Sequence, residues 1–499
     1  MPKSTALLDD LADGLSDLRF TTAYRIPFPY REVLNRMLVG GSIVTESRAV
    51  ELRDLDGNWR YDLGGSYGLN VFGYGFYKEC IAEGARRVEA LGPVLGPYHP
   101  VVIDIVERLK RVSGLDEVSF HMSGTEAVMQ AVRLARYHTG RTHLVRFCGA
   151  YHGWWDGVQP GVGNGRRVDD VYTLADHSER TLRVLETRRD IACVLVSPMQ
   201  ALHPNADAPG DGSLLRSDRK AGFDREAATA WLHRVREICM KRGIVLVFDE
   251  VFTGFRLGYR GAQGYFGIQA DLVTYGKTLG GGLPVGVVCG RRDLMKRFRD
   301  DTPADVCLAR GTFNSHPYVL GAMHVFLERL ESPEMQARYE RTDEIWGARV
   351  TAANRRLEEA DVPVRLAHMH SVVTVLYTTP SRYDWMFQFY LRAAGLELGW
   401  TGTGRFILSL AYTDEAFAEV TERLVRAALA MRADGWWWHS PELTNQAIGR
   451  MMMRDLIAAH LVSFRSRVFG SAPATAEADP RPEPAEDVLA ARPARSEVH

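Results

Sequence analysis

A lysine beside a run of glycines, and an aspartate 28 residues before it, are the side chains of this chain best suited to covalent chemistry. Lys277 follows the apolar residues 272–275 and precedes three consecutive glycines, and Asp249 ends the apolar run 244–248. A lysine amine can form a Schiff base with an aldehyde, and an aspartate at a buried strand end can salt-bridge a pyridinium nitrogen. This pair of side chains predicts pyridoxal 5'-phosphate (PLP) as the cofactor.

The same glycines allow a second interpretation, because Gly276-Lys277-Thr278 is also how a nucleotide-binding P-loop ends. That motif requires a glycine five places before Gly276, and the chain has Asp271 there. A lone lysine in a glycine-rich loop is also common as a surface turn residue. The choice among these interpretations therefore depends on the rest of the chain.

Length and charge narrow the classes of protein that need consideration. The chain has 499 residues, more than one hydrophobic core usually serves, so two or more domains are expected. Its 61 basic and 62 acidic residues give a net charge of −1. This balance gives no indication of a nucleic-acid partner or of an anionic membrane as a partner.

The chain also lacks sequence signals for a membrane or for secretion. No apolar run reaches the roughly 18 residues of a membrane span, and the acidic residues near the start do not fit a signal peptide. We therefore expect a cytoplasmic protein. Six cysteines without metal-like spacing are expected to be reduced core residues; they are Cys80, Cys148, Cys193, Cys239, Cys289 and Cys307.

Short apolar runs and longer amphipathic stretches alternate through the middle of the chain. Residues 191–196, 244–248, 272–275 and 285–289 have the composition of buried parallel strands, and the stretches between them are long enough for crossover helices. This pattern predicts an α/β fold with a mainly parallel sheet covered by helices. Ligands of such sheets bind at the carboxyl ends of the strands, where Asp249 and Lys277 fall.

The domain organisation follows from changes in this pattern. A turn signal at Asp56-Gly57 predicts a hairpin in the N-terminal segment. The C-terminal end is rich in Ala, Pro, Glu and Arg and is expected to be disordered. We predict an N-terminal segment that joins the small domain, a large cofactor-binding domain, a smaller α/β domain, a helical extension and a disordered tail, at residues 1–75, 76–330, 331–440, 441–470 and 471–499.

Two further motifs could complete a PLP site. Ser123-Gly124-Thr125 begins an expected helix, whose N-terminus offers free N–H groups and a positive dipole to a phosphate; an ordinary helix cap is the other interpretation. Tyr151-His152 follows an expected strand, and an aromatic side chain there could stack on a pyridine ring or be half-buried in a loop.

Together these motifs resemble class III PLP-dependent aminotransferases of fold type I. The likeness covers about residues 40–430 and rests on five motifs in order, residues 123–127, 151–153, 249–256, 276–282 and 311–313. Within the class, the chain is similar to glutamate-1-semialdehyde aminomutases. It looks closer still to the aminotransferase modules of polyketide and prodiginine-type pathways, which aminate carbonyl groups of aliphatic intermediates.

The resemblance implies a role for each matched residue. Lys277 forms the Schiff base and moves the proton of the substrate, and Asp249 keeps the pyridine nitrogen protonated. Thr312 is expected to reach the phosphate of the neighbouring subunit's cofactor, which predicts a homodimer. The remaining cofactor-binding residues are expected to be Ser123, Gly124, Thr125, Tyr151, His152 and Val251.

Departures from the family pattern bear on the substrate. Many members carry a glutamate two places beyond a glutamine, to pair with an arginine; here Gln200 is followed by Ala201 and Leu202. Arg405 matches that arginine, and we expect it either to bind the carboxylate of an amino-acid donor or to pair locally. Tyr67 matches an aromatic of the substrate pocket, although a core tyrosine is the alternative.

The sequence thus predicts an aminotransferase with an amino-acid donor and a small aldehyde or ketone as acceptor. An aminomutase that moves the amino group within one molecule is the first alternative. A catalytically inactive scaffold of the same fold is the second. Trp436-Trp437-Trp438 is expected to pack against the helical extension or, alternatively, to form a docking patch.

Overall fold

The computed structural model describes the chain as two units, Met1–Ile448 and Gly449–His499. The residues it describes are 2–12, 14–18, 42–159, 165–166, 168–199, 223–399 and 404–469. The predicted tail, 471–499, and the departure at position 202 lie outside these residues.

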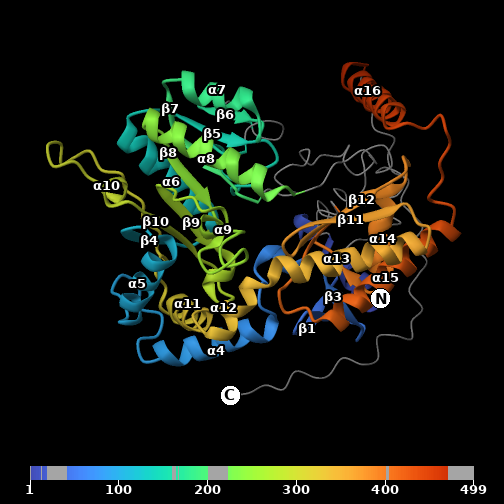
Figure 1. The fold of residues 1–499 in the computed structure, drawn as a ribbon, viewed down its shortest axis with the longest axis horizontal. Coiled ribbons are helices and arrows are strands. Elements are labelled where there is room, and N and C mark those ends of the chain that lie inside the picture. Colours follow the sequence, from blue (N-terminus) through green and yellow to red (C-terminus); the bar gives the residue numbers. More distant parts are fainter. Residues whose placement is uncertain are drawn as a thin grey trace. The chain divides into compact units, whose positions relative to one another are not determined.

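Within the first unit, the part built around the largest sheet is called the large domain below, and the part that follows residue 340 is called the C-terminal domain. A seven-stranded sheet forms the centre of the large domain (Figure 1). Its strands, in spatial order, are β4 (Glu117–His121), β10 (Gly286–Gly290), β9 (Leu272–Gly276), β8 (Val245–Asp249), β7 (Ile191–Val196), β5 (His143–Phe147) and β6 (Val171–Leu174). The pairs from β9 to β6 are parallel, as the apolar runs predict.

The expectation that residues 285–289 form a parallel strand is wrong. β10 runs antiparallel to both of its neighbours, β9 and β4. The physical reason is the connection: only residues 277–285 separate β9 from β10, and a parallel pair needs a crossover of a dozen or more residues. An apolar run of this kind does not encode strand direction.

Helices cover both faces of this sheet, and alternate side chains of its strands point to opposite cores. In β7, Cys193 and Leu195 lie in one core and Val194 and Val196 in the other. The first core includes α6 (Gly124–Thr139). The second core includes α4 (Tyr74–Val88), α5 (Val101–Ser113), α8 (Arg225–Arg242) and α11 (Pro317–Leu330).

The remaining helices of this domain are short. They are α7 (Glu179–Thr187), α9 (Gly261–Phe266), α10 (Arg292–Met295) and α12 (Pro333–Glu340), with a 3-10 turn, η3, at Lys277–Gly280. Five of the six cysteines are buried in this domain, but Cys148 is exposed. The expectation of a core position is therefore wrong for Cys148, because it lies where the chain leaves the carboxyl end of β5.

The N-terminal segment forms a second sheet, in which the predicted hairpin is confirmed. β2 (Glu51–Asp54) and β3 (Trp59–Asp62) pair antiparallel around Gly57, which has φ +92°. β1 (Val44–Arg48) flanks β2, and β13 (Leu396–Glu397), from the C-terminal part of the chain, pairs with β3. Helix α1 (Pro2–Ala12) is bound to the turn, since backbone N–H groups at its start donate to Asp56.

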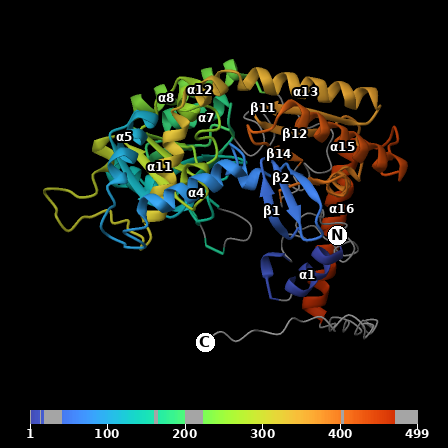
Figure 2. The same cartoon turned by 90° about the horizontal axis from the view of Figure 1, so that it is seen from below.

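The C-terminal domain has a three-stranded antiparallel sheet with helices beside it (Figure 2). The strands are β11 (Val364–Met369), β12 (Val372–Tyr377) and β14 (Arg405–Ile407). The helices are α13 (Thr342–Glu359), η4 (Asp384–Met386), α14 (Phe387–Ala393) and α15 (Asp414–Ala433).

The tryptophan run packs within this domain rather than as expected. The Trp437 ring lies 5.5 Å from that of Phe387, and its Nε1–H donates to the Ala428 carbonyl. Trp436 packs edge-on against Tyr383, while Trp438 is exposed. Trp437 thus contacts both α14 and α15, elements whose proximity the local sequence does not reveal.

The predicted helical extension is present as α16 (Asn445–Phe469). Among the residues that the structure describes, no helix combines the length and the apolar character needed to cross a membrane.

Candidate active site

Asp249 lies at the carboxyl end of β8, opposite Thr274 of β9. Its buried carboxylate accepts three hydrogen bonds. Oδ1 accepts from the Thr274 hydroxyl and from the Val251 N–H, both at 3.1 Å, and Oδ2 accepts from Nδ1–H of His152 at 2.7 Å. These donors fix the orientation of the carboxylate.

Lys277 begins η3, directly after β9, so the two adjacent parallel strands deliver an amine and a carboxylate to one edge of the sheet. Its backbone has φ +45°, an uncommon conformation for a residue other than glycine. Burial lowers the pKa of the amine, the charge of Asp249 opposes that shift, and Arg405 and Arg256 add to it. The surroundings of Lys277 therefore shift its amine toward the neutral, nucleophilic form.

Two guanidinium groups and the amine of Lys277 surround one aromatic ring. The Phe252 ring centroid lies 5.2 Å from Cζ of Arg256, 5.8 Å from Nζ of Lys277 and 5.9 Å from Cζ of Arg405. The negative face of an aromatic ring attracts cations at such distances. This part of the site is electropositive and suited to an anionic group of a substrate.

The start of α6 is built for close approach by other segments. Ser123 caps the helix, since its Oγ accepts from the Glu126 N–H at 3.3 Å. A Cβ on Gly124 would lie 2.7 Å from Cγ1 of Val251, and one on Gly153 would lie 2.5 Å from Oγ1 of Thr125. The capping interpretation is thus true of the Ser123 side chain, and the first N–H groups of the helix still have no intrahelical partner.

His152 and Tyr151 extend the site from the loop after β5. His152 is buried, and its Nε2 atom has no hydrogen-bond partner in the described part of the chain. Tyr151 is 60% exposed. Its pKa is raised by burial of part of the ring system and by the nearby charge of Asp249.

The structure brings Tyr67 and Arg405 to the same region from distant parts of the chain. Tyr67, with φ +59° and 57% exposed, lies in η1 (Gly65–Gly68), next to Gly68. A Cβ on Gly68 would meet the Phe252 ring at 2.5 Å and Cδ of Lys277 at 3.7 Å. Arg405 belongs to β14 and approaches the same ring.

Thr312 is placed differently. It is exposed before α11, and no hydrogen bond or ion pair of the described residues connects it to Lys277 or Asp249. Its expected contact with a second subunit stays a prediction.

The residues brought together fit PLP. A desolvated amine, a hydrogen-bonded carboxylate and the N-terminus of a 16-residue helix converge on one edge of the sheet. Close glycine contacts leave no room for larger residues there. The buried Nε2 atom of His152, which has no hydrogen-bond partner among the described residues, offers a polar contact to a ligand. An aldehyde, a pyridine nitrogen and a phosphate are the groups that such a set can hold.

Sequence reasoning missed three residues of this region, although all lie in the motif at residues 249–256. Phe252 and Arg256 contribute the ring and one of its cations. Glu250 is fully buried, and its carboxylate accepts hydrogen bonds from the backbone N–H groups of Ala262 and Gln263 at 2.7 and 3.2 Å. A charged residue in an otherwise apolar turn is the signal that could have identified Arg256 and Glu250.

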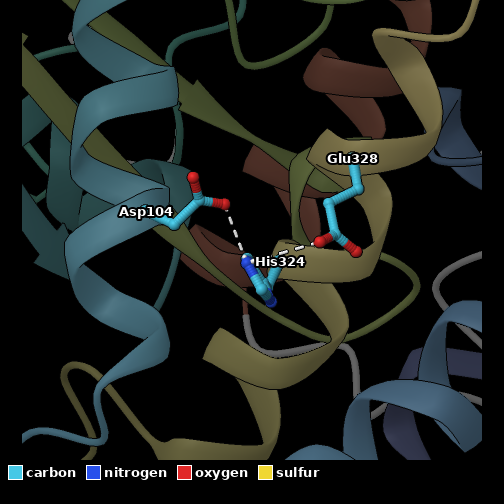
Figure 3. A group of neighbouring side chains, drawn as sticks. All are labelled: Asp104, His324 and Glu328. Carbon is cyan, nitrogen blue, oxygen red and sulfur yellow. Dashed lines mark hydrogen bonds and ion pairs between the residues drawn. The ribbon is translucent and has the colours of Figure 1, made fainter.

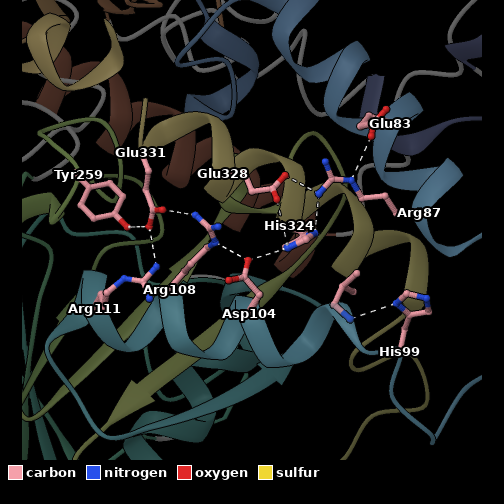
Figure 4. Close-up of polar contacts among 11 residues, drawn as sticks. Glu83, Arg87, His99, Asp104, Arg108, Arg111, Tyr259, His324, Glu328 and Glu331 are labelled. Carbon is pink, nitrogen blue, oxygen red and sulfur yellow. Dashed lines mark hydrogen bonds and ion pairs between the residues drawn. The ribbon is translucent and has the colours of Figure 1, made fainter. Parts of the chain in front are cut away.

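A cluster with the chemistry of metal ligands lies elsewhere, between α4, α5 and α11. Asp104, His324 and Glu328 place ligand atoms within 4.8 Å of one another (Figure 3). Arginines already occupy these atoms: Arg87 Nη1 lies 2.8 Å from His324 Nδ1 and 2.6 Å from Glu328, and Arg108 binds Asp104 at 2.5 Å (Figure 4). The cluster is an ion-pair network that connects the three helices.

Fold and site together define a PLP-dependent enzyme of fold type I. The sequence profile described as aminotransferase class-III matches residues 35–158 and 220–428, and the chain belongs to this family. It is a PLP-dependent aminotransferase.

Individual relatives agree with this assignment. A glutamate-1-semialdehyde 2,1-aminomutase of Methanocaldococcus jannaschii is 32% identical over 364 residues, which are 70% of this chain and 76% of the relative. A protein of the same name from Nitratidesulfovibrio vulgaris is 31% identical over 402 residues, 76% and 90% of the two chains. The crystal structure of an omega-transaminase from Sphaerobacter thermophilus superimposes with a TM-score of 0.65 at 26% identity and covers 80% of this chain and 96% of that chain.

Proposed function

We propose that this cytoplasmic aminotransferase moves an amino group from an amino-acid donor to an aldehyde or ketone on an aliphatic intermediate of secondary metabolism, of the prodiginine or polyketide type. PLP, when bound, supplies an aldehyde that takes up the amino group and a ring that stabilises the carbanion. The residues of the chain bind and orient the cofactor and substrates and move the proton.

The observation that carries the proposal is the environment of Lys277. Its amine is desolvated, and two arginines favour its neutral form. A neutral amine can attack an aldehyde and, once released, can accept and return a proton at Nζ. The Phe252 ring centroid lies 5.8 Å from this Nζ atom. Lys277 is therefore the group we assign to both covalent attachment and proton transfer.

Asp249 and the start of α6 are the groups that would hold the cofactor at its two ends. The three donors fix the orientation of the Asp249 carboxylate, which would pair with a protonated ring nitrogen. Ser123, Gly124 and Thr125 would hold the phosphate at the helix N-terminus. Val251, His152 and Tyr151 would lie along the ring between these ends.

Arg405 is the residue we assign to the carboxylate of the donor, and Tyr67 to the wall of the acceptor pocket. The cationic surroundings of Phe252 support binding of a carboxylate. A second arginine near the chain start, Arg48, is engaged elsewhere, since it pairs with Glu51 at 2.9 Å and covers the Trp59 ring.

An aminomutase is the second candidate, and the names of the relatives favour it: the two cited above are glutamate-1-semialdehyde 2,1-aminomutases. Both reactions use the same cofactor chemistry, but only a transaminase releases a keto acid from the donor. The release of a keto acid therefore separates the two functions.

We also propose a homodimer with active sites at the interface. Thr312 is exposed, as a residue reserved for a neighbouring subunit would be, and the adjacent Phe313 is 53% exposed despite its apolar ring. Light scattering of the purified protein tests this, and an active monomer would contradict it.

The test of the function is a half-reaction in the absence of an acceptor. Each of a panel of amino acids is mixed with the holoenzyme, and the keto acid is quantified together with the change in the visible band. A transaminase releases about one keto acid per site with its donor. Keto-acid release from no donor, together with conversion of glutamate-1-semialdehyde to 5-aminolevulinate, would establish the aminomutase instead.

Lys277→Ala and Lys296→Ala form the matched pair for this assay. Lys296 is a surface lysine paired with Asp300. We expect Lys277→Ala to lower turnover about 10³-fold or more and Lys296→Ala to leave it unchanged. Undiminished turnover in Lys277→Ala would refute the proposed catalytic role of Lys277.

A further inference from the structure

Arg256 is a fully buried arginine that no carboxylate of the described residues neutralises. Its guanidinium donates only to neutral oxygens. Nη1 donates to Ser371 Oγ at 2.7 Å and to the Leu408 carbonyl at 2.8 Å, and Nη2 donates to the Gly68 carbonyl at 3.3 Å. One side chain of the large domain thus binds the N-terminal segment and two segments of the C-terminal domain.

Such a position is unfavourable for a charge. Burial lowers the pKa of Arg256 to about 10, so the group stays charged at neutral pH although it is desolvated. Among the residues that the structure describes, none forms a hydrogen bond with its Nε atom. A buried cation without a counter-ion destabilises a fold. The arrangement therefore points to a role in addition to packing.

The three segments that Arg256 binds are the ones that shape the surroundings of Lys277. Gly68 packs against the Phe252 ring and against the aliphatic chain of Lys277. The guanidinium itself faces the same ring, with Cζ 5.2 Å from its centroid. The Leu408 carbonyl lies directly after β14, the strand that carries Arg405.

We propose that Arg256 is a positioning residue for Lys277: its guanidinium holds Gly68, Ser371 and Leu408 together, seats the Phe252 ring beside the lysine, and keeps a positive charge near the amine. The inference deepens the proposed function and rests on the proposed role of Lys277. A purely structural arginine would affect only stability. A positioning arginine also affects the chemical state of the amine.

The test compares Arg256→Met, which removes the charge, with Arg256→Lys, which keeps a charge but cannot reproduce a planar fork with several donors. Arg338→Met is the control, because Arg338 also binds a carbonyl of this region, that of Leu410, without facing Phe252. The first readout is the rate at which an amine-acylating reagent labels Lys277 in the apoprotein as a function of pH, measured by mass spectrometry.

We expect Arg256→Met to slow labelling of Lys277 at neutral pH by about three- to tenfold, because loss of one nearby cation raises the pKa of the amine. Arg256→Lys and Arg338→Met should label like the wild type. The second readout is amide hydrogen exchange of the holoenzyme. Exchange should become faster around Gly68, Ser371 and Leu408 in both Arg256 variants, since neither keeps all three bonds.

Two results would overturn the proposal. Wild-type labelling of Lys277 in Arg256→Met would show that the charge does not act on the amine. Faster exchange throughout the protein, without a local change, would show a structural role only. If Arg256→Met fails to fold, Arg256→Lys still tests the local exchange. The labelling of the apoprotein does not depend on turnover. Failure of the Arg256 inference can therefore be distinguished from failure of the proposed aminotransferase function, which the half-reaction assay tests.

Discussion

Replacement of Glu250 by glutamine should remove part of the pH dependence of the free energy of unfolding. Glu250 follows Asp249 and is fully buried. Burial is the main cause that raises its pKa from 4.5 to about 7, the neighbouring Asp249 acts in the same direction, and the N–H groups of Ala262 and Gln263 oppose the shift. The folded protein thus holds a proton at Glu250 over a pH range in which the unfolded chain has released it.

The sign and size of the effect follow from this difference. Between pH 4.5 and pH 7 the folded state binds more protons at Glu250 than the unfolded state, so its contribution to stability is fully present below pH 4.5 and is lost as the pH rises through 7. This rise in the pKa of Glu250, from 4.5 to about 7, corresponds to about 3 kcal/mol of unfolding free energy. Glu250→Gln cannot ionise and does not lose this contribution.

The assay is urea unfolding of the holoenzyme at a fixed excess of PLP between pH 5 and pH 8. Relative to the wild type, we expect Glu250→Gln to gain about 3 kcal/mol of unfolding free energy from pH 5 to pH 8. Glu340→Gln, on the exposed surface of α12, serves as the control for removal of a charge. Parallel stability curves for wild type and Glu250→Gln would refute the reasoning.

Two further substitutions test the site itself. Gly286→Ala would place a Cβ 1.9 Å from the Ser123 carbonyl, so α6 must shift; overpacking of this kind costs about 1–3 kcal/mol, and cofactor affinity, measured by fluorescence titration, should fall about tenfold or more. Wild-type affinity would contradict this. His152→Ala leaves Asp249 Oδ2 without its 2.7 Å partner. The unsatisfied carboxylate costs about 1–3 kcal/mol, and an unchanged thermal midpoint of the apoprotein would argue against the bond.

Residue patterns alone were enough to predict most strands of the central sheet and the edge of the sheet where the chemistry lies. Apolar runs of five or six residues are strands because both faces of the sheet are buried. Lys277 and Asp249 follow two such runs, and the carboxyl ends of parallel strands share one edge. Their proximity was therefore predictable before any coordinate was known.

The distant segments that complete the site could not be identified without the folded structure. Tyr67 precedes the large domain and Arg405 follows it, and no local pattern states that η1 and β14 meet at Phe252. The direction of β10 depends on the length of a connection, which the composition of the strand does not contain. The three carbonyl and hydroxyl partners of Arg256 come from separate segments. Periodicity reports which face of an element is buried, whereas the partner of that face is set by the packing of the whole chain.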